Sequence, residues 1–109
     1  LPDLWIGSKD APVVIVEYAS TTCSHCAAFH NGTFKELKTK YIDTGKVRFV
    51  LREFPLNPVD MGAYMLARCS DDKRDAVVSL LFAQQQAWAN DKPLAGLSQI
   101  LRQTGMSQD

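Results

Sequence analysis

The sequence lacks an excess of charge of either sign. Its 12 lysines and arginines balance its 12 aspartates and glutamates, and neither sign gathers into a block along the chain. Domains that bind nucleic acid or an anionic membrane surface carry a basic patch or stripe. The charge pattern therefore predicts neither a nucleic acid nor a membrane surface as a partner.

Long hydrophobic runs are also missing. The longest apolar stretches, Val13 to Val16 and Ala76 to Phe82, are far shorter than the roughly 20 residues that a helix needs to cross a bilayer. The first residues show no basic patch followed by an apolar segment and a small-residue cleavage site. We therefore expect a mature form without a signal peptide, whose location has to be inferred from its chemistry.

Cysteine is scarce as well. Three cysteines in 109 residues are too few for a disulfide-scaffolded miniprotein, and the odd number leaves one without a partner inside the chain. Because 46% of the residues are hydrophobic, the chain can build a core without such a scaffold, and its length suits one core rather than two.

The first half of the sequence predicts a strand, a helix and a second strand. Residues 13–18 are β-branched and aromatic without polar alternation, which is typical of a strand covered on both faces, and residues 47–54 predict a second strand. Between them we expect a helix that a hydroxyl of residues 20–22 caps, that bends at Asn31–Gly32 and that ends at Gly45. Such a crossover makes the strands parallel and places the helix start at the carboxyl edge of the sheet.

The second half of the sequence predicts helices. Pro58 suits a first helical turn, and Met61, Met65 and Cys69 share one helix face at a spacing of four residues. Two further helices carry stripes at helical spacing, which are Val77, Leu80, Leu81, Gln84 and Trp88 for one and Leu94, Leu97 and Leu101 for the other. We therefore divide the chain into a βαβ unit with the active site at residues 1–56 and a helical subdomain at residues 57–109.

A Cys-x-x-Cys motif, Cys23-Ser24-His25-Cys26, lies where the first strand leads into the first helix. This context favours a redox motif. Free N–H groups and the dipole at a helix start lower the pKa of a thiol, so we expect Cys23 to be the nucleophile. Cys26, one turn later, is expected to be the resolving cysteine, and His25 can stabilise the Cys23 thiolate by a hydrogen bond or by charge.

Other interpretations of the motif are weaker. A structural zinc site needs four ligands, and beyond the pair only Cys69, His25 and His30 are available. Haem attachment requires a histidine directly after the second cysteine, where Ala27 stands. A static disulfide or two inert thiols are the remaining alternatives.

Two further titratable residues lie close to the motif in the sequence. Glu17 interrupts an apolar strand, so we expect it to lie beneath the helix start and to move a proton to or from Cys26, unless it is a solvated glutamate at the edge. His30 follows Cys26 by one helical turn, and it either lines the site or, in the interpretation that we prefer, makes a hydrogen bond at the surface.

Several segments resemble the DsbA-like branch of the thioredoxin superfamily in family order. They are DAPVVIVEY at residues 10–18, TCSHC at 22–26, FH at 29–30, REFPL at 52–56, ARC at 67–69, QAW at 86–88 and Gly105. The resemblance implies an α/β thioredoxin domain interrupted by a helical insertion. It also implies export to the bacterial periplasm, oxidation of newly secreted polypeptides, and reoxidation by a membrane-bound, quinone-linked partner.

The sequence departs from the family pattern in two places. The family commonly has proline after the first cysteine, where this chain has Ser24. The chain ends at Asp109, before the ββα portion and the cis-proline loop that the family carries, so we expect a fragment or an assembly with a missing C-terminal segment. The resemblance suggests that Cys69 is a structural cysteine paired with one beyond Asp109, and a buried unpaired thiol is the alternative.

We therefore predict a thiol-disulfide oxidoreductase that donates disulfides to reduced secreted polypeptides and needs no cofactor besides its Cys23–Cys26 disulfide. The first alternative is a non-catalytic fragment that docks a complementary C-terminal segment. The second alternative is a zinc-binding module.

Overall fold

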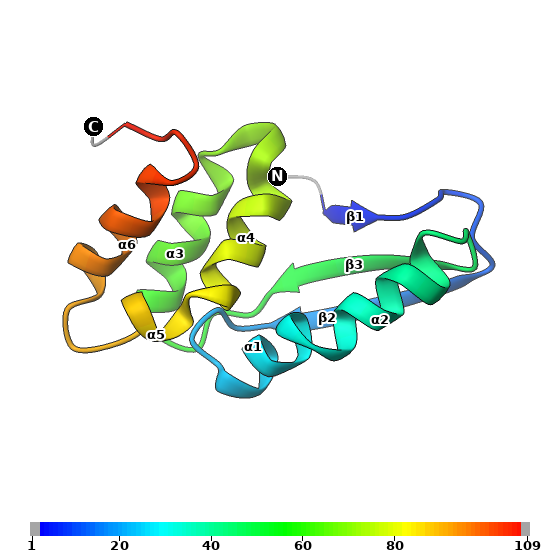
Figure 1. The fold of residues 1–109 in the computed structure, drawn as a ribbon, viewed down its shortest axis with the longest axis horizontal. Helices are drawn as coiled ribbons and strands as arrows, with labels where there is room; N and C mark the ends of the chain where they lie inside the picture. Colours follow the sequence, from blue (N-terminus) through cyan, green and yellow to red (C-terminus); the bar gives the residue numbers. More distant parts are fainter. Residues whose placement is uncertain (1–2, 108–109) are drawn as a thin grey trace.

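A three-stranded sheet forms one end of the computed structural model, which describes residues 3–107 (Figure 1). Strands β1 (Leu4–Ile6), β2 (Val13–Ala19) and β3 (Val47–Glu53) lie in the order β1-β3-β2. β1 runs antiparallel to β3, and β2 runs parallel to β3 with Val16 opposite Val50. The predicted parallel strand, helix, strand unit is therefore confirmed, with a short N-terminal strand added to it.

The segment between β2 and β3 packs along one side of the sheet (Figure 1). It comprises α1 (Ser24–Asn31), α2 (Thr33–Leu37) and the π-helical turn η1 (Lys38–Ile42). Gly32 separates α1 from α2 with a φ of −127° and a ψ of −90°, which are not helical angles. The bend predicted at this glycine is confirmed.

Strand β2 differs from the expectation that both of its faces are covered. Val14, Val16 and Tyr18 are 52%, 43% and 61% exposed, whereas the alternate residues Ile15 and Glu17 are partly buried. Among residues 3–107, β2 is an edge strand, and only the face toward α1 is covered. Periodicity does not reveal this difference, because an apolar run looks the same whether one face or both faces find a partner.

Four helices and a short 3-10 turn follow β3 and lie beside the carboxyl end of the sheet (Figure 1). They are α3 (Pro58–Arg68), η2 (Asp71–Lys73), α4 (Arg74–Ala83), α5 (Gln85–Trp88) and α6 (Pro93–Arg102). We call residues 58–102 the helical segment. In the part of the chain that the structure describes, none of the helices is long and apolar enough to span a membrane.

One hydrophobic core joins the sheet to the helical segment. Its fully buried members include Phe49 of β3, Leu81 and Phe82 of α4, and Trp88 of α5. The indole N–H of Trp88 donates to the carbonyl of Leu81 at 2.8 Å, so its one polar atom is satisfied inside the core. This shared core fixes α4 against α1, and α1 begins at the second residue of the cysteine motif.

The face of α3 that the sequence pattern favoured is not the buried one. Met61 and Met65 are 50% and 60% exposed, and Cys69 is exposed. The helix instead buries Ala63, Tyr64 and Ala67, together with Asp60. The alternative of a buried, unpaired Cys69 thiol is therefore wrong. The side chain lines an apolar cavity of about 500 Å³ between α3 and α6.

Candidate redox site

The cysteine motif begins α1 at the carboxyl edge of β2. Cys23 is the N-cap residue, with a φ of −77° and a ψ of 118°, and its sulfur accepts a hydrogen bond from the backbone N–H of Cys26 at 3.3 Å. Its carbonyl accepts the first helical hydrogen bond, from Ala27 at 3.1 Å. The sulfur thus faces the free N–H groups at the positive end of the helix dipole. The predicted placement of the motif is confirmed.

The two thiols differ in acidity. Hydrogen bonds from the thiol and from the backbone N–H of Cys26, with a smaller contribution from the N–H of His25, lower the pKa of Cys23 below its ordinary value of 9.0. Burial and the hydrogen bond to Cys23 raise the pKa of Cys26. Both cysteines are free and half-buried. The opposite directions of the two pKa shifts favour Cys23 as the nucleophile, and the roles of the two cysteines stay predictions.

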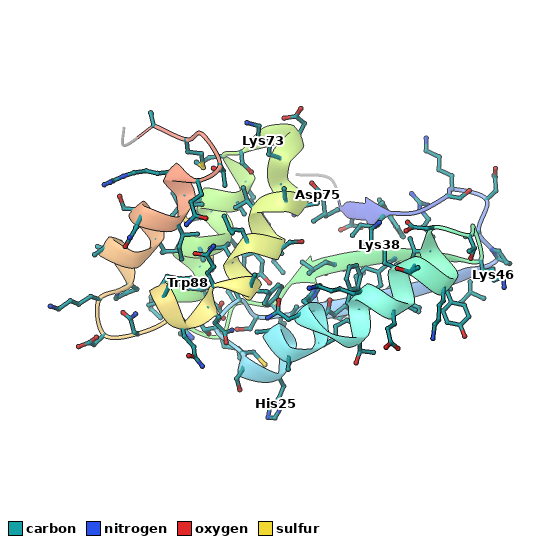
Figure 2. All side chains as sticks on the ribbon, viewed as in Figure 1. His25, Lys38, Lys46, Lys73, Asp75 and Trp88 are labelled. Carbon is teal, nitrogen blue, oxygen red and sulfur yellow. The ribbon has the colours of Figure 1, made fainter. Side chains whose placement is uncertain are left out.

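Ser24 and His25 occupy the outer side of the helix start, and both are exposed. Figure 2 shows the His25 ring pointing away from the body of the molecule. His25 lowers the pKa of Cys23 through its backbone N–H. Stabilisation of the Cys23 thiolate by the His25 ring stays a prediction. Ser24 lines a cavity of about 380 Å³ that α1 shares with residues 82–87.

Glu17 of β2 and His30 in the last turn of α1 form a close pair. Glu17 Oε1 lies 2.6 Å from His30 Nε2, and the side chains are only 17% and 8% exposed. The alternative of a solvated Glu17 at the edge is therefore wrong. The interpretation of His30 as a residue that makes a hydrogen bond at the surface is wrong as well. The negative charge of Glu17 contributes to raising the pKa of Cys26, which places the carboxylate within electrostatic reach of the resolving thiol. Its predicted role in proton transfer remains a prediction.

Aromatic rings fix the position of His30. Its ring stacks on Phe82 of α4 with centroids 4.3 Å apart and planes 6° apart, and it lies 4.9 Å from the ring of Phe34. Phe49 meets it edge-on from β3. The histidine therefore links the sheet, α1 and α4, a role that sequence spacing along α1 does not reveal.

Asp60 is a site residue that the sequence analysis missed. It lies in the first turn of α3, is fully buried, and accepts hydrogen bonds from the loop that precedes Cys23. An aspartate two positions after Pro58 normally caps or faces solvent at a helix start, so its position alone gives no signal of burial. The hydroxyls of Ser20–Thr22, from which we expected a helix cap, instead donate to this carboxylate.

A metal centre finds little support in this arrangement. Within residues 3–107, no three histidine, cysteine, aspartate or glutamate side chains gather in a way that could hold a metal ion. His30, one of the extra ligands considered for zinc, is engaged by Glu17 and by the surrounding rings.

Comparison with known proteins agrees with this geometry. A family model described as thioredoxin matches residues 1–108. A putative protein-disulfide oxidoreductase of Rickettsia bellii is 44% identical over 89 residues, which make up 80% of this chain and 34% of that protein. A probable disulfide bond formation protein D of Bacillus cereus is 37% identical over 60 residues, which make up 53% of this chain and 28% of that protein. The chain thus spans about a third of the length of these curated relatives.

Solved structures show the same fold. The crystal structure of Wolbachia pipientis alpha-DsbA1 superposes with a TM-score of 0.89 at 36% identity, covering all of this chain and 57% of that one. BdbD from Bacillus subtilis, in its oxidised form, superposes with a TM-score of 0.65 at 21% identity, covering 95% of this chain and 68% of that one. The second match shows the fold alone.

Proposed function

The chain belongs to the thioredoxin family, in its DsbA-like branch, and from this premise we propose that it is a thiol-disulfide oxidoreductase that donates disulfides to reduced secreted polypeptides. The observation that carries the proposal is the position of Cys23 at the start of α1, with its pKa lowered by Cys26. A stabilised Cys23 thiolate favours the reduced form of the pair, and this makes the Cys23–Cys26 disulfide a better oxidant.

The reaction needs no cofactor besides this disulfide. A substrate thiolate attacks the sulfur of Cys23, the Cys23–Cys26 bond breaks, and Cys26 leaves as a thiolate that takes up a proton. A second substrate thiolate then attacks the substrate sulfur of the mixed disulfide, and Cys23 leaves as the thiolate. Two electrons pass from the substrate dithiol to the protein. We propose that Glu17, whose charge contributes to raising the pKa of Cys26, delivers or accepts the proton there, and that its contact with His30 orients it.

The direction of exchange is supported by the lowered pKa of Cys23 and by the names of the relatives, among them disulfide bond formation proteins. An oxidant of this kind works outside the cytoplasm, where disulfides persist, so we place the protein in the periplasm or another extracytoplasmic compartment. Its reoxidation then requires a second redox protein, and we propose a membrane-bound, quinone-linked one.

Two surfaces fit a further segment of protein. β2 offers an unpaired strand edge beside an exposed apolar face with Val16 and Tyr18, and exposed Cys69 offers a thiol at the end of α3. We propose that a C-terminal segment pairs with β2 and that a cysteine in it bonds to Cys69. If this docking is the only role of the chain, then the second candidate function, a non-catalytic module, applies instead.

Thiol trapping tests the redox function. The oxidised protein is mixed with a reduced, unfolded polypeptide in equal amounts, and free thiols on both are alkylated and counted by intact mass. We expect Cys23 and Cys26 to become reduced as the substrate loses two thiols. Unchanged thiols on both proteins would refute the redox function. A complementary segment that binds in native mass spectrometry without thiol exchange would support the docking module.

A further inference from the structure

The loop that leads into Cys23 is held by side chains of the helical segment. Residues 20–23 connect β2 to α1, and Ser20 and Thr21 are buried. The contacts come from Asp60 and Tyr64 on α3 and from Gln85 at the start of α5. These residues lie about 40 to 65 positions further along the chain, so the tertiary structure brings them to the loop.

Asp60 holds the middle of the loop. Its carboxylate accepts the hydroxyl of Ser20, the hydroxyl of Thr21 at 2.5 Å, and both the N–H and the hydroxyl of Thr22 at 2.9 and 3.2 Å. The N–H of Leu56 adds a further donor at 3.0 Å. Burial alone would raise the pKa of Asp60, but these hydrogen bonds outweigh burial and lower it. The carboxylate therefore stays charged and keeps the three hydroxyls and the N–H of Thr22 oriented toward it.

Gln85 and Tyr64 hold the carbonyl groups of the same loop. The side-chain amide of Gln85 donates to the carbonyls of Thr21 at 2.7 Å and of Cys23 at 3.0 Å, so both of its N–H bonds are used. Both partners are acceptors, and this fixes which end of the amide faces the loop. The hydroxyl of Tyr64 donates to the carbonyl of Ala19, where β2 ends.

From these contacts we infer that Asp60 and Gln85 are positioning residues for the thiol chemistry, through which the helical segment sets the place of the Cys23 sulfur. The inference rests on the proposed function, since it concerns the same exchanging thiol. It also assigns the helical segment a direct part in tuning the redox site, beyond packing against it.

The effect passes through the backbone of Cys23. Its carbonyl accepts from both Gln85 and Ala27, and its sulfur accepts from the N–H of Cys26. A rotation of the Cys23 backbone therefore moves the sulfur relative to the helix start. Hydrogen bonds weaken steeply with poor alignment, so a small rotation reduces the stabilisation of the thiolate. Removing the Gln85 contact should consequently raise the pKa of Cys23.

The test compares Gln85→Met with Gln86→Met in the whole protein. Methionine matches glutamine in length but cannot donate, and Gln86 is the exposed neighbour of buried Gln85. The pKa of Cys23 is measured by the ultraviolet absorbance of the thiolate, as the difference between reduced and oxidised protein. We expect Gln85→Met to raise this pKa by about half a unit, on the scale of one hydrogen bond, and Gln86→Met to leave it unchanged.

The redox equilibrium of the Cys23–Cys26 disulfide should change together with the pKa of Cys23. A thiolate less stable by half a pKa unit shifts the equilibrium with glutathione about threefold toward the oxidised protein. Thr21→Val provides a second variant if Gln85→Met does not fold, because it removes one hydroxyl from the cluster while Asp60 keeps its other donors. We expect the same direction of change from it.

Different results would refute the positioning role of Asp60 and Gln85 and the proposed oxidoreductase function. A lower unfolding midpoint in urea with an unchanged Cys23 pKa in both variants would show a purely structural role and would overturn the inference. A parent protein that fails to oxidise a reduced polypeptide would refute the proposed function. The pKa comparison would still decide whether Gln85 positions Cys23, because it does not depend on the substrate.

Discussion

Replacing His30 by phenylalanine tests whether the buried pair with Glu17 stabilises the fold. Phenylalanine keeps an aromatic ring of similar size in the stack against Phe82, but it cannot hydrogen-bond to the carboxylate. The variant therefore removes the 2.6 Å contact and leaves Glu17 in place, with only 17% of its side chain exposed. Little water is available to replace the lost partner.

The expected loss follows from this geometry. A hydrogen bond to a charged group contributes about 1.5 to 3 kcal/mol, and a partner left behind without solvent adds a desolvation penalty. The larger apolar surface of phenylalanine offsets part of the loss. We expect a net decrease of about 2 kcal/mol in the free energy of unfolding, which corresponds to a fall in Tm of about 10 °C for a chain of this size.

Urea unfolding of the reduced protein measures the effect, with His25→Phe as the matched control in the same helix. His25 is exposed, so its replacement should change stability by no more than about 0.5 kcal/mol. In a Glu17→Leu background, His30→Phe should cost much less, because the carboxylate is gone. Equal losses for His30→Phe with and without Glu17 would refute the pairing argument and assign the effect to packing alone.

Three further predictions follow from the same structure. Glu17→Gln should slow resolution of a mixed disulfide by Cys26 more than it slows attack at Cys23, and equal slowing in rapid alkylation experiments would contradict proton transfer through Glu17. The folded state lowers the pKa of Cys23, so the reduced parent protein should gain stability relative to Cys23→Ser as the pH rises toward 9.0. It should lose this added stability as the pH falls through the lowered pKa. A difference in urea midpoint between the two proteins that does not depend on pH would argue against a stabilised thiolate. An alanine Cβ at Gly96 would lie 2.6 Å from a backbone carbon of α5, so Gly96→Ala should lower the free energy of unfolding by about 1 to 3 kcal/mol in thermal unfolding. Gly62 has open space around it, so Gly62→Ala should stabilise α3 by about 0.5 to 1 kcal/mol.

The features that sequence predicted well depend on neighbours in the chain. The position of Cys23 at a helix start, the bend at Gly32 and the first turn of α3 at Pro58 all follow from local backbone preferences. The parallel pairing of β2 with β3 follows from the crossover between them. Each of these features is encoded within a few residues or in a connection of known handedness.

The features that sequence failed to predict depend on contacts between distant segments. Asp60 looks like an ordinary residue of a first helical turn until the hydroxyls of residues 20–22 meet it. His30 looks like a surface residue on α1 until Phe82 of α4 stacks on it. Met61 and Met65 share a helix face with Cys69, yet α3 turns its alanines and Tyr64 to the core. A periodic pattern identifies helix faces but does not identify the face that finds a partner.

The position of Asp60 has opposing effects on the nucleophile. Its negative charge raises the pKa of Cys23, which works against the thiolate that the proposed reaction needs. The same carboxylate orders Ser20–Thr22 and so keeps the Cys23 sulfur directed at the N–H of Cys26. The charge of Asp60 affects the pKa of Cys23 less than the hydrogen bonds from Cys26 do. In the positioning role that we propose for Asp60, the alignment of the loop lowers the pKa of Cys23, while the direct repulsion by its charge raises that pKa by less than the hydrogen bonds from Cys26 lower it.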